Sequence, residues 1–102
     1  MAEHAVLPIN KIEPLNNKNY YVWALKVAAV LRNRKLYREV IESQEPARVA
    51  NEESEAGKKR IIWENKNDEA FSIIILTWSE EQAGQFLGET KAKVVWDELK
   101  RR

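Results

Sequence analysis

Residues 61–78 read IIWENKNDEAFSIIILTW, and this stretch decides the fold. Its core-type positions recur at spacings of three and four residues, as they do along one side of an α-helix. This stripe consists of Ile62, Trp63, Asn67, Ala70, Phe71, Ile74, Ile75 and Trp78. The run Ile73–Ile75 has strand propensity, but the pattern around it is too long for a strand. We therefore predict one long helix that begins before Arg60.

Two shorter helices are predicted on the C-terminal side of this stretch. Ser79 has the character of an N-cap, with Gln82 three positions on as in a capping box. The helix that follows should carry Ala83, Phe86 and Leu87 and stop at Gly88. Thr90 should then cap a last helix, in which apolar residues repeat at helical spacing. These residues are Ala92, Val95, Trp96 and Leu99.

On the N-terminal side, a helix is predicted to begin at Asn16–Asn17, because asparagine accepts hydrogen bonds from the free amides of a first turn. Its helically spaced apolar residues are Tyr20, Trp23, Val27, Val30 and Leu31. Its other sides are also apolar, through Val22, Leu25, Ala28 and Ala29. We therefore expect several neighbours to bury this helix. The polar residues 33–35 should end it, and residues 36–41 should form one short second helix.

Two stretches lie outside the predicted helices. Residues 1–15 contain Pro8 and Pro14, which oppose a helix, so we expect an extended N-terminal arm. The apolar residues of the arm are Leu7, Ile9, Ile12 and Leu15, and we expect them to dock on a helix face of the same chain or of a neighbour. Residues 42–59 are densely charged and predict a mobile connection. The sequence thus predicts an all-α fold, a compact bundle of about five helices over residues 16–102.

Composition narrows the class of protein. The 102 residues suit a single domain, and 17 basic against 16 acidic residues give a net charge of only +1. Such a balance does not by itself select nucleic acid or an anionic membrane. The chain has no cysteine, and no apolar run approaches the roughly 20 residues that a membrane span requires. We expect a cytoplasmic protein with no membrane partner.

Candidate catalytic groups are sparse. The single histidine, His4, lies in the arm, so a serine or cysteine triad is not expected. Glu64 and Asp68 are four residues apart on one predicted helix face, but a solvated face explains them better than a metal site does. The glycines fit no phosphate-binding loop. We therefore expect no enzyme activity, no cofactor, no metal and no small-molecule substrate.

Some side chains are candidates for contacts with other molecules. Two basic clusters are candidates for weak nucleic-acid contact: Arg32, Arg34 and Lys35, and Lys58, Lys59 and Arg60. A helix end explains the first cluster, and preceding glutamates offset the second. Among the tryptophans, we expect Trp23, Trp63 and Trp96 to share one core, whereas Trp78, at a helix end, should be partly exposed. The candidate protein contacts are Trp78, Tyr21, Leu7 and Ile9.

The order of these segments resembles the Gag region of copia-type retrotransposons. The resemblance covers nearly all of residues 15–102, and it rests on loose motifs in a shared order. The matching segments are LNNKNYYVW (15–23), Val30–Leu31, LYREVI (36–41), Trp63 to Leu76 with Asp68 and Ala70, and the helix with Thr90, Ala92, Trp96 and Leu99.

This resemblance implies a fold like the N-terminal domain of retroviral capsids and a structural role in building a particle shell. It implies self as the partner, in weak contacts that multivalency strengthens. RNA would be bound through a zinc knuckle of the parent polyprotein, a motif that these residues do not contain. Two alternatives stay open: a domesticated Gag-derived module that binds a protein or peptide, and a nucleic-acid-binding helical domain.

Overall fold

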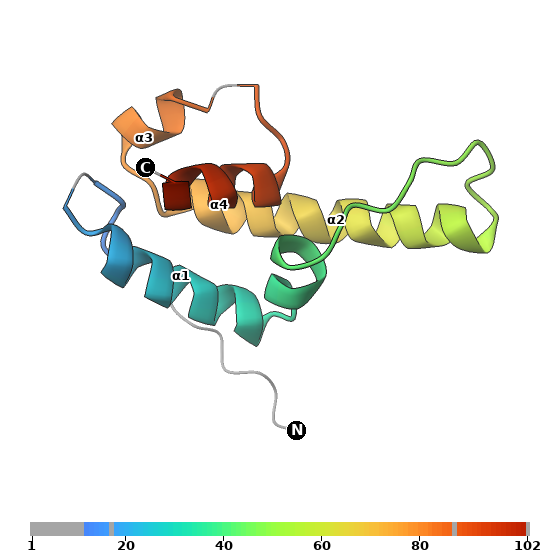
Figure 1. Cartoon of the computed structure of the whole chain (residues 1–102), viewed down its shortest axis with the longest axis horizontal. Coiled ribbons are helices and arrows are strands. Elements are labelled where there is room, and N and C mark those ends of the chain that lie inside the picture. The colour runs from blue at the N-terminus through green and yellow to red at the C-terminus, as the bar shows by residue number, and fades with distance from the viewer. Residues whose placement is uncertain (1–11, 17, 87, 102) are drawn as a thin grey trace.

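The computed structural model describes residues 12–16, 18–86 and 88–101, and in these the chain forms helices and no strand. The elements, in chain order, are α1 (Tyr20–Asn33), η2 (Tyr37–Ile41), α2 (Glu55–Leu76), α3 (Glu80–Gly84) and α4 (Ala92–Arg101) (Figure 1). The all-α prediction is confirmed. The short second helix η2 is a single π-helical turn. None of the helices in these ranges combines the length and apolarity that crossing a bilayer demands.

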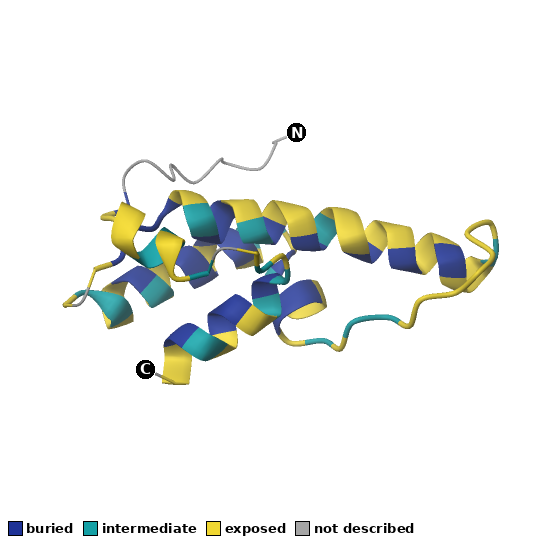
Figure 2. Ribbon diagram, turned by 90° about the horizontal axis from the view of Figure 1, so that it is seen from above, coloured by how far each residue is buried: buried dark blue, intermediate teal, exposed yellow. Residues whose placement is uncertain are grey.

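The long helix α2 organises the bundle. The Ser54 hydroxyl caps it by accepting a hydrogen bond from the Gly57 amide. Because α2 begins at Glu55, the charged connection covers residues 42–54, and the predicted limit of 59 was wrong. The second half of α2 packs against α1, η2 and α4, whereas its first half projects beyond them with the connection alongside (Figure 1). Figure 2 shows the buried residues of α2 on its inner side and the exposed residues on its outer side.

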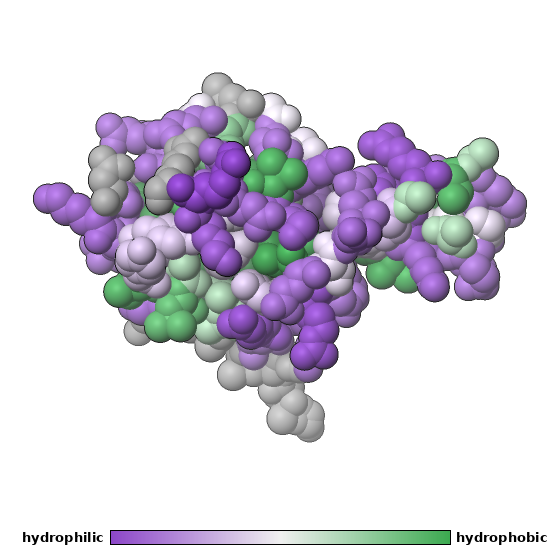
Figure 3. Space-filling model, viewed as in Figure 1, coloured by the Kyte–Doolittle hydropathy of each residue, from purple (hydrophilic) through white to green (hydrophobic). Residues whose placement is uncertain are grey.

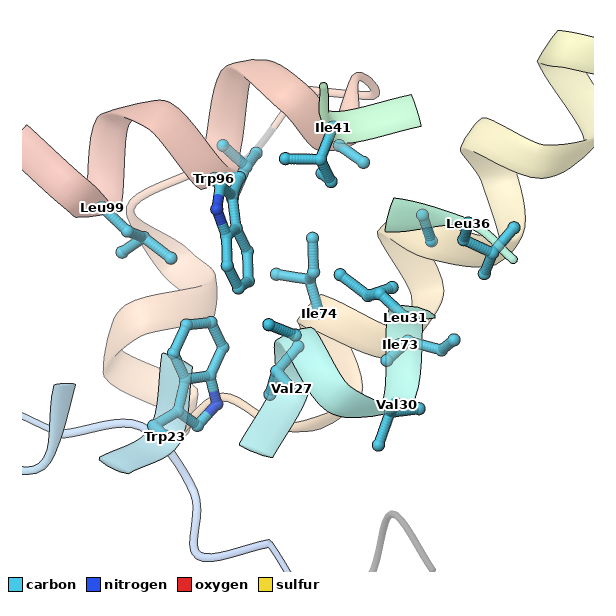
Figure 4. Close-up of a cluster of buried hydrophobic side chains, with 14 of the residues drawn as sticks. Trp23, Val27, Val30, Leu31, Leu36, Ile41, Ile73, Ile74, Trp96 and Leu99 are labelled. Carbon is cyan, nitrogen blue, oxygen red and sulfur yellow. The ribbon is translucent and has the colours of Figure 1, made fainter. Parts of the chain in front are cut away.

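The core centres on two tryptophans from opposite ends of the chain. Trp23 of α1 and Trp96 of α4 are buried, with ring centroids 5.7 Å apart. Aliphatic side chains from four segments surround them (Figure 4). These are Val27, Val30, Leu31, Leu36, Ile41, Ile73, Ile74 and Leu99. Such a core excludes water from the largest apolar side chains of the chain.

Trp63 does not belong to this core, so the prediction of three tryptophans in one cluster was wrong. It lies ten residues before Ile73 on α2, which corresponds to roughly 15 Å along a helix axis. Trp63 is nevertheless buried, and the Arg60 guanidinium lies 4.9 Å from its ring centroid. It forms a separate packing site under the connection.

The segment before α1 docks on the end of α2. The Leu15 amide donates to the Thr77 carbonyl at 2.9 Å, and the Ser79 amide donates back to the Leu15 carbonyl at 3.3 Å. Ile12 and Leu15 are both buried, which confirms docking for these two arm residues. Leu7 and Ile9 lie outside the described residues.

Helix α1 begins at Tyr20, later than predicted, because the side chains of Asn16 and Asn19 form a turn before it. The Asn19 side chain accepts a hydrogen bond from the Asn16 amide and donates one to the Pro14 carbonyl. The Asn16 side chain in turn accepts from the Lys18 amide. Side chains of this kind compete with the helix for local backbone groups.

A side chain of α2 caps the N-terminus of helix α4. The buried Asn67 of α2 accepts a hydrogen bond from the Ala92 amide at 2.9 Å and donates one to the Thr90 carbonyl at 2.8 Å. The first backbone hydrogen bond of the helix runs from Val95 to Lys91, so Lys91 holds the cap position predicted for Thr90. The two helices are thereby joined by a polar contact inside an otherwise apolar interface.

Candidate functional site

The outer side of α1 is apolar and open to solvent. Tyr21 is 87% exposed, Leu25 71% and Val22 57%, and Ala29 is exposed beside them. Their spacing of four and seven residues places them on one side of the helix, opposite the buried Trp23. We call these four residues the α1 face. Figure 3 shows hydrophobic surface over the N-terminal half of α1, at the lower left of the view.

The exposure of the α1 face corrects a prediction. We expected several neighbours to bury α1, since it is apolar nearly all round, but Val22 and Leu25 have no covering element in the described chain. The sequence does show that α1 has more apolar residues than a single core can bury. What it could not show is which side the bundle covers. Contiguous exposed apolar residues of this kind mark contact surfaces.

The charges around the α1 face are all positive. The helix carries Lys26 and Arg32 and no acidic residue. The Arg32 guanidinium lies 4.1 Å from the centroid of the Tyr37 ring, which holds it at the end of the helix. Burial raises the pKa of the Tyr20 phenol, with Tyr21 adding to the shift, so this tyrosine stays neutral beside the face. The α1 face is therefore apolar with a basic margin.

A second exposed apolar side chain has an acidic setting. Leu76, at the end of α2, is 72% exposed. Glu69 and Ser72 precede it by seven and four residues, and so lie on the same side of the helix. Glu80 and Glu81 follow it at the exposed start of α3. We call these five residues the Leu76 surface.

Trp78 is not part of any exposed surface, contrary to prediction. It is only 7% exposed and packs against Phe86, with ring centroids 5.1 Å apart. The docked Leu15 segment runs beside its backbone as an isolated parallel bridge. Of the candidate protein contacts in the described residues, Tyr21 alone is exposed.

The first basic cluster is partly occupied by intramolecular contacts. Arg34 forms an ion pair with Glu69 at 3.4 Å, and Arg32 lies on Tyr37. Lys35 is exposed, in a left-handed conformation with φ of 64° that turns the chain from α1 into η2. A surface pocket of about 300 Å³ lies here, lined by Arg32, Lys35, Tyr37, Arg38, Glu39 and Glu42. The two glutamates offset two of the three cations in this lining, which weakens its attraction for a phosphate.

In the second basic cluster, Arg60 is bound within its own chain. Arg60 is buried, and its guanidinium donates to Glu45 at 2.5 Å, to Glu64 at 2.9 Å and to the Pro46 carbonyl at 2.7 Å. It therefore fastens the connection to α2 and is not available to a nucleic acid, which corrects its candidate role. Lys58 and Lys59 are exposed.

This network also reaches α4. Lys91 pairs with the second oxygen of Glu45 at 2.8 Å. Hydrogen bonds from Lys91 and then Arg60 hold the pKa of the Glu45 carboxyl below its ordinary value of 4.5. The hydrogen bond that Arg60 donates to Glu45 in turn raises the pKa of Arg60. The carboxylate thus serves as a hub between the connection, α2 and α4.

The described residues bring no further metal ligands to the candidate carboxylate pair of Glu64 and Asp68. Within the described ranges, no three histidine, aspartate or glutamate side chains gather as a metal site would need. Glu64, one member of the candidate carboxylate pair, is bound by Arg60.

Comparison with known proteins adds no assignment. No family model, no curated protein and no solved structure matches this chain.

Proposed function

We propose that this chain is a structural assembly domain of the capsid type, from a copia-like Gag polyprotein, that self-associates into a particle shell. The observation that carries the proposal is the α1 face. Tyr21, Val22 and Leu25 are all more than half exposed on one side of a helix whose other side is fully used by the core. An apolar face of this kind is a contact surface for another protein. Its role requires no catalytic group.

The size of the α1 face fits weak, repeated contacts. Full burial of a large apolar side chain stabilises by about 1.5–3 kcal/mol. Association itself costs at least about 4 kcal/mol in lost freedom of motion. A few such side chains therefore give a contact that is weak in a single pair and strong only when many copies engage together.

The resemblance of residues 15–102 to copia-type Gag supports the same role. In this proposal the partner is a second copy of the chain, in the cytoplasm. RNA would associate through the parent polyprotein, and this fragment would not be its main binding site.

Sedimentation velocity over a concentration series tests the proposal. We expect the weight-average sedimentation coefficient of the chain to rise as the concentration approaches about 1 mM, where a contact of about 4 kcal/mol is populated. The Leu25→Ser variant should remove this rise. The matched control is Val94→Ser, because Val94 is also partly exposed but lies on α4. A chain that stays monomeric throughout the series would contradict the assembly role.

A further inference from the structure

We propose that the α1 face docks on the Leu76 surface of a second copy, in a head-to-tail contact between two different surfaces. This inference rests on the proposed assembly function and specifies its interface. Both surfaces present large apolar side chains to solvent, Leu25 on one and Leu76 on the other. Their surrounding charges are opposite in sign.

Charge argues against the simpler pairing of one α1 face with another. Every charged residue of α1 is basic, so two copies of the helix would bring Lys26 against Lys26 with no acid on either helix. Lys26 lies near the middle of α1, where a two-fold axis through the helix pair would pass. Like charges placed together in an interface are unfavourable.

The Leu76 surface supplies the missing acids. Glu80 and Glu81 are exposed just beyond Leu76, and Glu69 lies two turns before it. In the part of the chain that the structure describes, Lys26, Glu80 and Glu81 take part in no ion pair. Glu69 is shared with Arg34 of its own chain. Free charges of opposite sign are thus available on the two surfaces.

A contact between two different surfaces leaves one surface of each copy free. A copy that docks its α1 face still offers its own Leu76 surface to the next copy. Heterologous contacts therefore build rings or open-ended chains, as a shell requires, whereas a self-complementary pair stops at the dimer.

Charge reversal on each surface tests the inference. The first variant is Lys26→Glu, and the second is the double variant Glu80→Lys/Glu81→Lys. We expect each alone to weaken self-association by at least about tenfold, because each then opposes like charges in the contact. Mixed in equal amounts, the two variants should associate again. The carboxylate introduced on α1 of the first meets the lysines introduced on the Leu76 surface of the second, and their unaltered surfaces also match.

Glu52→Lys/Glu53→Lys is the matched control, since it makes the same change of charge in the connection. It should associate as the unaltered chain does, and circular dichroism should show that all variants keep their helix content. If Glu80→Lys/Glu81→Lys associates as tightly as the unaltered chain, or if the mixture stays monomeric, the inference is overturned while the assembly function stands. Association that ends at the dimer overturns the head-to-tail arrangement. An unaltered chain that never associates contradicts the assembly function as well.

Discussion

The side chain of Asn67 meets the first amide of α4, accepting a hydrogen bond from Ala92 at 2.9 Å. The Nδ2 group of the Asn67 side chain donates to the Thr90 carbonyl. Asn67 and Ala92 are buried, so the Ala92 amide would have no water as a substitute partner, whereas Thr90 is exposed and its hydrogen bond is only partly buried. This pair of hydrogen bonds fixes where α4 begins against α2.

Replacing Asn67 should therefore be costly. We expect Asn67→Ala to lower the free energy of unfolding by about 2–4 kcal/mol, because it leaves the buried Ala92 amide without a partner and removes the partly buried hydrogen bond to the Thr90 carbonyl. Asn65→Ala is the control, since Asn65 is exposed two residues earlier on the same helix, and its effect should stay within about 0.5 kcal/mol. Urea denaturation of both variants provides the measurement. Equal effects would show that Asn67 contributes only helix propensity.

The paired tryptophans of the core should respond together. Trp96→Ala is expected to lower the free energy of unfolding by about 3–5 kcal/mol, as truncation of a large buried aromatic does. In a double-mutant cycle, Trp23→Phe and Trp96→Phe should show a coupling of about 0.5–1.5 kcal/mol, because their rings are in contact. Trp63→Phe with Trp96→Phe should instead be additive. A loss below about 1 kcal/mol for Trp96→Ala would contradict its burial.

The segment before α1 should contribute measurably to stability. Leu15 is buried against the end of α2, so Leu15→Ala is expected to cost about 2–4 kcal/mol. Glu13→Ala, an exposed change in the same segment, should be nearly neutral. Thermal unfolding of the two variants compares them directly. A Leu15→Ala variant as stable as the unaltered chain would mean that this segment lies on the bundle without stabilising it.

The Glu45 carboxylate should make the chain sensitive to acid. Its pKa is lower in the folded chain than its ordinary value of 4.5, so the stabilisation is complete above that value. It is lost as the pH falls through the lower, folded pKa. Glu45→Gln should reduce stability at about pH 7 and flatten its decline toward about pH 3, as measured by urea midpoints. Glu53→Gln, in the same connection, is the matched control, because Glu53 forms none of the ion pairs found in the described residues, and it should lower stability at about pH 7 less than Glu45→Gln does.

Local patterns in the sequence predicted much of this fold correctly. The period of residues 61–78 identified α2, and the spacing of Ser79 and Gln82 identified a cap whose hydrogen bond the structure contains. The break at residues 33–35 was also correct. Each of these features depends on residues within a few positions of one another, which is why sequence alone is sufficient for them.

The shifted starts of α1 and α2 depend on local side-chain hydrogen bonds of Asn16, Asn19 and Ser54. The other errors concern contacts between distant segments. Trp78 was expected at the surface because it ends a helix, but it is buried against Phe86, and Leu15, far earlier in the chain, pairs with its backbone. Arg60 was a candidate for weak nucleic-acid contact, yet Glu45 folds back onto it. The α1 face could be recognised as a surplus of apolar residues but not located, since its side depends on where α2 and α4 pack. Such relations follow from tertiary packing, which periodicity does not encode.

The two halves of α2 differ in how they are packed, so we expect the backbone hydrogen bonds of its first half to open more easily than those of its second half. Its second half packs against α1, η2 and α4. Its first half contacts the connection, through the hydrogen bonds of Arg60 with Glu45 and Pro46. Hydrogen exchange reports the free energy of such local opening, amide by amide. Amides near Ile74 should exchange only by global unfolding, and those near Lys59 through cheaper local fraying. The projecting half of α2 is therefore the part of this bundle that can change shape without disturbing the core.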